Sequence, residues 1–202
     1  MFSAFKINKV AERKVTFAQL VNGQTLAVTE KERYWRYQSV IHKVVSDWTT
    51  LTFSWDDQLA GSNKPDPGVS VGSNSTVTTN SWFASLLLEP EFGKVSLQEI
   101  AKLTPSSVFT GQTRSVAIVS YLSDAREIRQ GEWEVDVVST RLLINRTTGQ
   151  EERIPFNRTF TLKAVEISQS PLGKHAPLVE QKIYEIRSAG LEITKIVAFT
   201  PK

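Results

Sequence analysis

The chain has 202 residues, of which 40% are hydrophobic and 22% are charged, so its length and composition predict one globular domain with a sizeable core. It contains no cysteine and only two histidines, His42 and His175, which excludes disulfides, thiolate metal sites, a cysteine nucleophile and histidine-rich metal sites. The net charge is +3 and no segment is densely basic, so specific nucleic-acid binding is not predicted.

Residues 1–29 are expected to form a separate N-terminal segment that contains a β-hairpin. Residues 15–20 and 25–28 are β-prone, and Asn22-Gly23 between them supplies the positive φ angles of a tight turn. The basic residues before the hairpin could lie beside a membrane surface, although an ordinary solvated tail is favoured; they are Lys6, Lys9, Arg13 and Lys14. No apolar run here or elsewhere approaches the ~20 residues that a membrane-spanning helix needs.

A long helix is predicted over residues 30–54. Thr29 and Glu32 have the spacing of a capping box at its start. Behind them, apolar residues recur every three or four positions and form one stripe: Tyr34, Tyr37, Ile41, Val44, Trp48, Leu51 and Trp55. The last turns are rich in threonine, so a switch to strand near Leu51 is the alternative.

The middle of the chain is predicted to hold a polar loop and two short helices. Residues 61–81 are mostly Gly, Ser, Asn, Pro and Thr, which favours a long, mobile loop. A helix over residues 81–88 should stop before Pro90. A second helix, over residues 96–103, should open with a capping box of Ser96 and Glu99.

From residue 114 onward the apolar period becomes two, which predicts β-strands joined by short turns. The expected strands cover residues 114–128, 133–144, 153–167, 179–186 and 191–199. Helices followed by consecutive antiparallel strands define an α+β fold. We therefore expect residues 30–202 to form an α+β domain in which a long helix lies across a curved antiparallel sheet, the cone-like arrangement of the nuclear-transport-factor-two superfamily. A lipocalin-like barrel is the alternative.

Few residues suggest chemistry. His42, Asp47 and Asp56 are the catalytic candidates, because a cone-fold isomerase or dehydratase would place an Asp and a His in its pocket. A half-buried helix histidine more often serves packing, and carboxylates at a helix end are usually solvated. No phosphate-binding loop, dinucleotide fingerprint or metal-binding motif is present, so no cofactor and no metal are predicted.

The second half of the chain carries a family resemblance. Gly131-Glu132-Trp133-Glu134-Val135 leads into residues 155–162, and Ser170-Pro171-Leu172-Gly173 precedes an expected last strand near residues 179–184. Over residues 30–199 this order resembles the bitopic, VirB-type assembly factor of bacterial type IV secretion and conjugation machines. Ser170 stands where that family has Asn. The resemblance implies a non-enzymatic periplasmic domain that self-associates and contacts other secretion subunits, with a membrane anchor upstream.

The function predicted is therefore a scaffold subunit of a conjugation or secretion complex, at the periplasmic face of the inner membrane if an anchor precedes it and otherwise cytoplasmic. The partners are other secretion subunits and further copies of the chain. Aromatic residues and the turn motif are the candidates for contact: Tyr34, Tyr37, Trp55, Trp82, Pro171, Leu172 and Gly173. A cone-fold small-molecule binding protein or an isomerase-like enzyme is the alternative.

Overall fold

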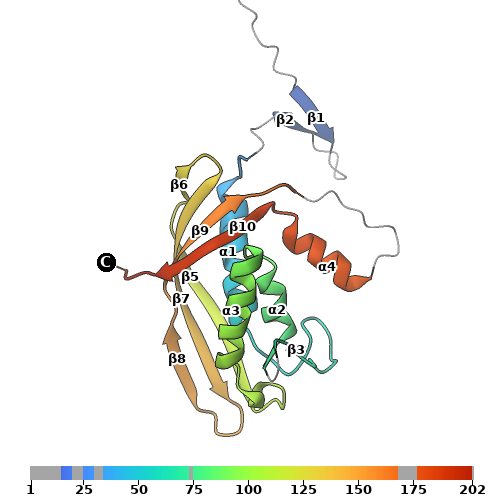
Figure 1. Ribbon diagram of the computed structural model, residues 1–202, viewed down its shortest axis with the longest axis vertical. Coiled ribbons are helices and arrows are strands. Elements are labelled where there is room, and N and C mark those ends of the chain that lie inside the picture. The colour runs from blue at the N-terminus through green and yellow to red at the C-terminus, as the bar shows by residue number, and fades with distance from the viewer. Residues whose placement is uncertain (1–14, 20–24, 30–33, 73–74, 168–176, 202) are drawn as a thin grey trace, which may run out of the picture. The chain divides into compact units, whose positions relative to one another are not determined.

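The computed structural model describes most of the chain (Figure 1). The residues outside its description are 1–14, 20–24, 30–33, 73–74, 168–176 and 202. The chain divides into two compact units. The first unit is Met1–Trp35 and the second is Arg36–Lys202. Each unit is described by itself below.

The first unit contains the predicted hairpin. Strands β1 (Val15–Gln19) and β2 (Thr25–Thr29) pair antiparallel, with Val15 opposite Thr29 and Gln19 opposite Thr25. The Asn22-Gly23 turn lies outside the described residues. The pairing confirms the predicted hairpin. The sequence could predict it because a hairpin depends mainly on interactions between residues close in the chain.

The second unit places its helices mainly before its strands. After α1 (Gln38–Phe53) come β3 (Val69–Ser70), β4 (Thr76–Val77), α2 (Thr79–Ser85), α3 (Pro90–Leu103) and a short 3₁₀ turn (Ser106–Val108). The remaining elements are β5 (Thr113–Leu122), β6 (Arg126–Arg129), β7 (Glu132–Asn145), β8 (Glu151–Pro155), β9 (Arg158–Ala164), α4 (Leu178–Arg187) and β10 (Leu191–Ala198). The predicted α+β class is confirmed.

The main sheet has six antiparallel strands built around β7. Its order is β10-β9-β7-β5, and β6 and β8 also pair with β7. The ladder is irregular in β5 between Val119 and Tyr121, and in β10 between Ile193 and Lys195. Such bulges bend a strand and increase its twist. The sheet accordingly curves, and α1, α2 and α3 lie on one side of it (Figure 1).

Two long strands of the prediction are each divided in the structure. Residues 114–128 form β5 and β6, and residues 153–167 form β8 and β9. The second break falls at Phe156, whose backbone N–H donates to the carbonyl of Ser139. Ser139 in turn donates its hydroxyl to the carbonyl of Phe156. The division lets β8 pair with the second half of β7 and β9 with the first half.

The core lies between α1 and the inner face of the sheet. Alternate residues of the strands are buried: Trp133, Val135 and Val137 on β7, Phe160 and Leu162 on β9, and Leu191 and Ile193 on β10. From α1, the ring of Trp48 packs edge-on against Phe160 at 5.3 Å and lies 6.2 Å from the ring of Phe156. Aromatic side chains therefore fill the curve of the sheet.

The predicted start of the long helix is wrong. Helix α1 begins at Gln38, and Tyr37 precedes it without a side-chain cap. Thr29 belongs to β2, where it pairs with Val15, and Glu32 lies outside the described residues. The capping-box spacing was therefore a local coincidence that strand pairing overrides.

The end of α1 agrees with the prediction within one residue, and the alternative of a strand near Leu51 is wrong. The helix continues to Phe53 because Thr49 and Thr52 are buried in it, and Thr49 donates its hydroxyl to the carbonyl of Val45 one turn earlier. Trp55 follows the helix and forms a bridge to Ser115 on β5.

Both short helices are confirmed as elements, but their boundaries differ. Helix α2 starts at Thr79, where Thr78 accepts a hydrogen bond from the N–H of Ser81. Helix α3 starts at Pro90, because proline fits the first helical position and the carboxylate of Glu89 accepts from the N–H of Phe92. Ser96 lies inside α3, so the predicted Ser96–Glu99 capping box is wrong.

The segment over residues 61–81 is more ordered than its composition suggests. It contains β3, β4 and the first residues of α2. Buried Asp66 organises it by accepting hydrogen bonds from the N–H of Gly68 and from both the N–H and the hydroxyl of Thr79. Gly68 has φ +70°, and a Cβ atom there would lie 2.4 Å from Thr76. A buried carboxylate thus replaces the apolar contacts that a polar loop lacks.

The predicted strand over residues 179–186 is wrong, because this segment is helix α4. Its apolar residues Val179, Ile183 and Ile186 also fit helical spacing, and Pro177 stands at the N-cap. Lys182 and Glu185 form an ion pair across one turn. The last strand, β10, instead pairs with β9.

Candidate functional site

The three catalytic candidates lie at separate places. The ring Nε2 of His42 lies 2.9 Å from the carbonyl oxygen of Ser123. Asp47 forms an ion pair with Lys43 on the same helix. His42 and Asp47 are five residues apart, so they project about 140° apart around α1. Asp56 follows the helix, whose axis rises about 16 Å between His42 and Phe53.

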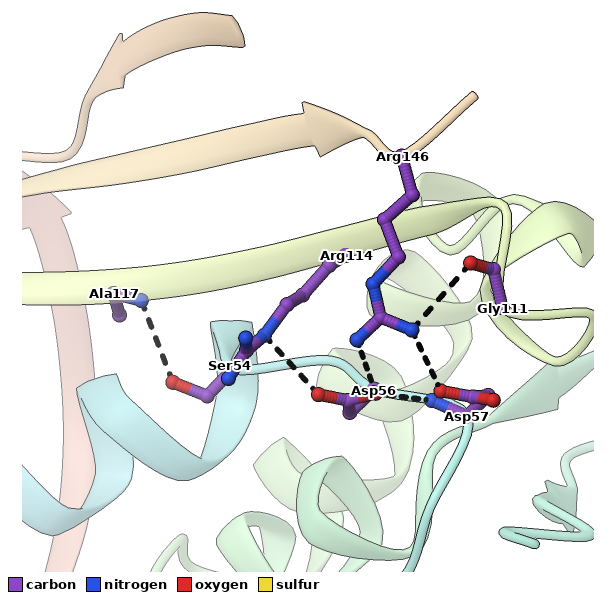
Figure 2. A network of polar contacts seen from close by, with 7 residues as sticks. All are labelled: Ser54, Asp56, Asp57, Gly111, Arg114, Ala117 and Arg146. Atoms are coloured by element: carbon purple, nitrogen blue, oxygen red, sulfur yellow. Dashed lines mark hydrogen bonds and ion pairs between the residues drawn. The ribbon is translucent and has the colours of Figure 1, made fainter. Parts of the chain in front are cut away.

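Asp56 and Asp57 are part of an ion network that joins the end of α1 to the sheet (Figure 2). Asp56 pairs with Arg146 at 2.8 Å and with Arg114 at 3.1 Å, and Asp57 pairs with Arg146 at 3.0 Å. The hydrogen bond with the carboxyl group of Asp56, followed by that from Arg146, holds the pKa of Asp57 below its ordinary value. The lowered pKa favours the ionised form of Asp57, in which it serves as an ion-pair partner of Arg146.

Arg141 is a buried charge that the sequence reasoning missed. It is 8% exposed, and its guanidinium lies 4.0 Å from the centre of the Trp55 ring, while Nε donates to the hydroxyl of Ser115 at 3.0 Å. Burial lowers its pKa. Its position in the inward-facing series of β7, two residues after Ser139, was the signal in the sequence that could have located it.

The interaction candidates differ in accessibility. Tyr37, just before α1, is 61% exposed, and Tyr34 in the first unit is 42% exposed. Trp55 is fully buried, and Trp82 is half-buried with its ring 5.1 Å from that of Phe83. The motif Pro171, Leu172 and Gly173 lies outside the described residues. Tyr34 and Tyr37 therefore present the accessible aromatic surface among these candidates.

Further apolar side chains are exposed on the second unit. Strand β5 exposes Ile118 and Tyr121, which are 51% and 55% accessible. Helix α3 exposes Val95 and Leu103. Ile118 and Tyr121 lie on the same strand and are therefore the candidates for an apolar contact surface on β5.

An open groove of about 950 Å³ lies beside α2 and α4. Leu59, Phe83, Val179 and Tyr184 contribute its apolar lining, and Lys64 and Asn80 add polar groups. The groove lies within the second unit and brings together the loop after α1, the start of α2 and one side of α4.

The described part of the chain shows neither a metal cluster nor a spanning helix. No group of three or more His, Asp or Glu side chains in it could hold a metal ion. Within those same residues, no helix is long and apolar enough to cross a membrane.

No protein-family model and no curated protein matches the chain. Several solved structures resemble it at low identity. The soluble domain of TrwG, from the type IV secretion machinery of Bartonella grahamii, is 13% identical, with 80% of this chain and 93% of that chain covered and a TM-score of 0.48. A periplasmic fragment of TraM is 12% identical, with coverages of 80% and 96% and a TM-score of 0.47.

An IcmL-like type IV secretion system protein from Legionella pneumophila is 9% identical, with 82% of this chain and 96% of that chain covered and a TM-score of 0.47. Two of these neighbours are thus described as type IV secretion components and the third as a periplasmic fragment. Likeness at this level, with every TM-score below 0.5, does not by itself assign a function to the chain.

Proposed function

We propose that the chain is a non-enzymatic assembly subunit of a bacterial conjugation or type IV secretion complex. It acts by contacting other subunits and further copies of itself, on the periplasmic side of the inner membrane. The proposal starts from the sequence resemblance to the VirB-type factor over residues 30–199, which the 131–135 and 155–162 segments carry. The last strand in the structure is β10, and the segment near residues 179–184 is helix α4.

The observation that supports this proposal best is the filled inner face of the sheet. A cone-fold enzyme needs its polar groups to converge in a pocket. Here the inner face of the sheet is occupied by Trp48, Phe53 and Phe156, which pack against one another with ring centres 4.6 to 6.2 Å apart. The apolar side chains of Tyr37, Ile118 and Tyr121 are instead presented outward. Binding through outer surfaces is therefore favoured over chemistry inside the cone.

The test is gene deletion in the parent bacterium with transfer of a conjugative plasmid or a secreted protein as the readout. Deletion should abolish transfer, and the wild-type chain should restore it. His42→Ala and Asp47→Asn should restore it equally, whereas loss of a catalytic acid or base would reduce activity about 100-fold or more. Normal transfer without the gene, or failure of both folded variants, would contradict the proposal.

Self-association has its own measurement. Sedimentation velocity over a wide range of concentrations should show a shift from monomer to a larger species. The double variant Ile118→Asp/Tyr121→Asp should reduce this shift if copies associate through β5, because it places charges on exposed apolar positions. A chain that stays monomeric at the highest concentration would remove self-association from the proposal.

A further inference from the structure

The groove beside α2 and α4 combines an apolar lining with accessible side chains. Val179 is 53% exposed, and Phe83 and Tyr184 are half-buried. Covering apolar surface that is in contact with water lowers the free energy of the system, so it favours the binding of a ligand. At about 950 Å³ and open on one side, the groove is as large as the upper range of small-molecule pockets.

The polar groups of this groove define the charge of its occupant. Lys182 is already paired with Glu185 at 2.9 Å. The ammonium of Lys64 makes no hydrogen bond or ion pair with any residue that the structure describes, so it leaves the groove with one uncompensated positive charge. A carboxylate on the occupant would complement this charge.

Asn80 is a half-buried amide that can complement a peptide occupant. Its side-chain amide has no hydrogen-bond partner in the described part of the chain. An amide both donates and accepts, as a peptide group does, so Asn80 can bind a main-chain N–H and C=O. A fatty acid would offer a carboxylate and an apolar tail but nothing for the donor and acceptor of Asn80 together.

We propose that the α2–α4 groove binds a short apolar segment of a partner protein, with one Asp or Glu of that segment facing Lys64. The apolar side chains of the segment lie against Phe83, Val179 and Tyr184, and its main chain pairs with Asn80. That the occupant belongs to a protein rests on the proposed function. The groove thereby gives the assembly subunit a specific surface for a partner's acidic, apolar segment.

Selection of phage-displayed random 12-residue peptides on the full chain tests this assignment. The enriched peptides should combine apolar residues with Asp or Glu. Fluorescence anisotropy of one labelled peptide should then show roughly fivefold weaker binding to Lys64→Glu and no detectable binding to Phe83→Asp. Lys195→Glu, an exposed lysine on β10 outside the groove, is the matched control and should bind like the wild type.

A charge exchange separates direct contact from misfolding. A peptide whose acidic residue is replaced by lysine should bind the Lys64→Glu variant better than the wild type. Absence of enriched peptides, equal binding by Lys64→Glu and the wild type, or competition by decanoate but by no peptide would overturn the assignment.

The two proposals fail in different ways. If deletion abolishes transfer but Lys64→Glu and Phe83→Asp support it fully, the groove assignment is wrong and the assembly role stands. If deletion leaves transfer unchanged, the assembly role is wrong, whatever the peptides do.

Discussion

At the scale of single residues, Arg141 is a charge placed inside an aromatic core. Its guanidinium stacks on Trp55 and also lies 5.7 Å from the centre of the Phe53 ring. In the described part of the chain no carboxylate lies within ion-pair distance of it, and the charge of Glu152 offsets only part of the effect of burial on its pKa. Because removing a charge from water costs free energy, a buried cation without an ion-pair partner is weak evidence for stability.

Two substitutions separate these effects. Arg141→Met keeps most of the side-chain volume without the charge, so the free energy of unfolding should be unchanged or up to ~2 kcal/mol higher. Arg141→Ala leaves a cavity and should lower the free energy of unfolding by about 2–3 kcal/mol. Urea unfolding measures both. A methionine variant that loses as much stability relative to the wild type as the alanine variant does would show that the charge itself holds the core together.

Asp136 is a residue whose charge stabilises the folded sheet. It accepts hydrogen bonds from Arg126 at 2.7 Å and from the hydroxyl of Thr159 at 2.6 Å. The bond from Arg126 is the largest cause that holds the pKa of Asp136 below its ordinary value. Because the folded-state pKa lies below the unfolded-state value of about 3.9, this stabilisation is fully present above that value. It is lost as the pH falls through the folded-state pKa.

Asp136→Asn should therefore lower the free energy of unfolding by about 1–2 kcal/mol at pH 7 and by less at pH 3. Urea unfolding at both pH values measures the difference. Glu99→Gln is the control, since Glu99 pairs with Lys102 in an exposed position on α3 and should have no measurable effect. An Asp136→Asn effect that is equal at both pH values would contradict this account.

At the scale of elements, the turn between α4 and β10 is held by Arg36. Its guanidinium donates to the carbonyls of Val165, Ala189 and Gly190 at 2.8 to 3.0 Å. Gly190 has φ +59°, and a Cβ atom there would lie 2.5 Å from Arg36. The close approach of backbone and guanidinium therefore requires glycine.

A pair of glycine variants tests this crowding. Gly149 also has positive φ, +73°, but has nothing within 4 Å of its missing Cβ. Gly149→Ala should therefore lower the free energy of unfolding by about 1 kcal/mol, through backbone strain alone. Gly190→Ala should cost about 3 kcal/mol, because strain and collision add. Thermal or urea unfolding compares them, and equal losses would mean that Arg36 and Ile167, which lies equally close at 2.5 Å, both move aside freely.

At the scale of the whole molecule, the second unit contains a core of buried hydrophobic residues that runs from Ile41 to Ile193. The hairpin of the first unit has two short strands, and isolated two-stranded hairpins are marginally stable. The second unit should accordingly carry the cooperative unfolding transition.

Removal of residues 1–35 tests this division. The remaining chain should keep its far-ultraviolet circular dichroism apart from the hairpin contribution, and its thermal midpoint should change by less than about 4 °C, the equivalent of about 1 kcal/mol. A larger fall would show that the hairpin stabilises the second unit.

Local patterns in the sequence determined the hairpin, the existence of α1, α2 and α3, the antiparallel strands and hence the α+β class. Turn residues and apolar periodicity act over a few residues, so these features could be read without a structure. The alternation of residues along β7 was equally visible, and it placed Trp133, Val135 and Val137 correctly on one face of the strand, which is the buried face.

Only the tertiary structure decided the features that depend on distant residues. Arg146 meets Asp56 and Asp57 across about 90 positions, and Arg141 becomes buried because Trp55 folds back onto β5. The catalytic candidates separate and the α2–α4 groove forms for the same reason. Each of these outcomes depends on burial and pairing between segments far apart in the chain, which no local pattern encodes.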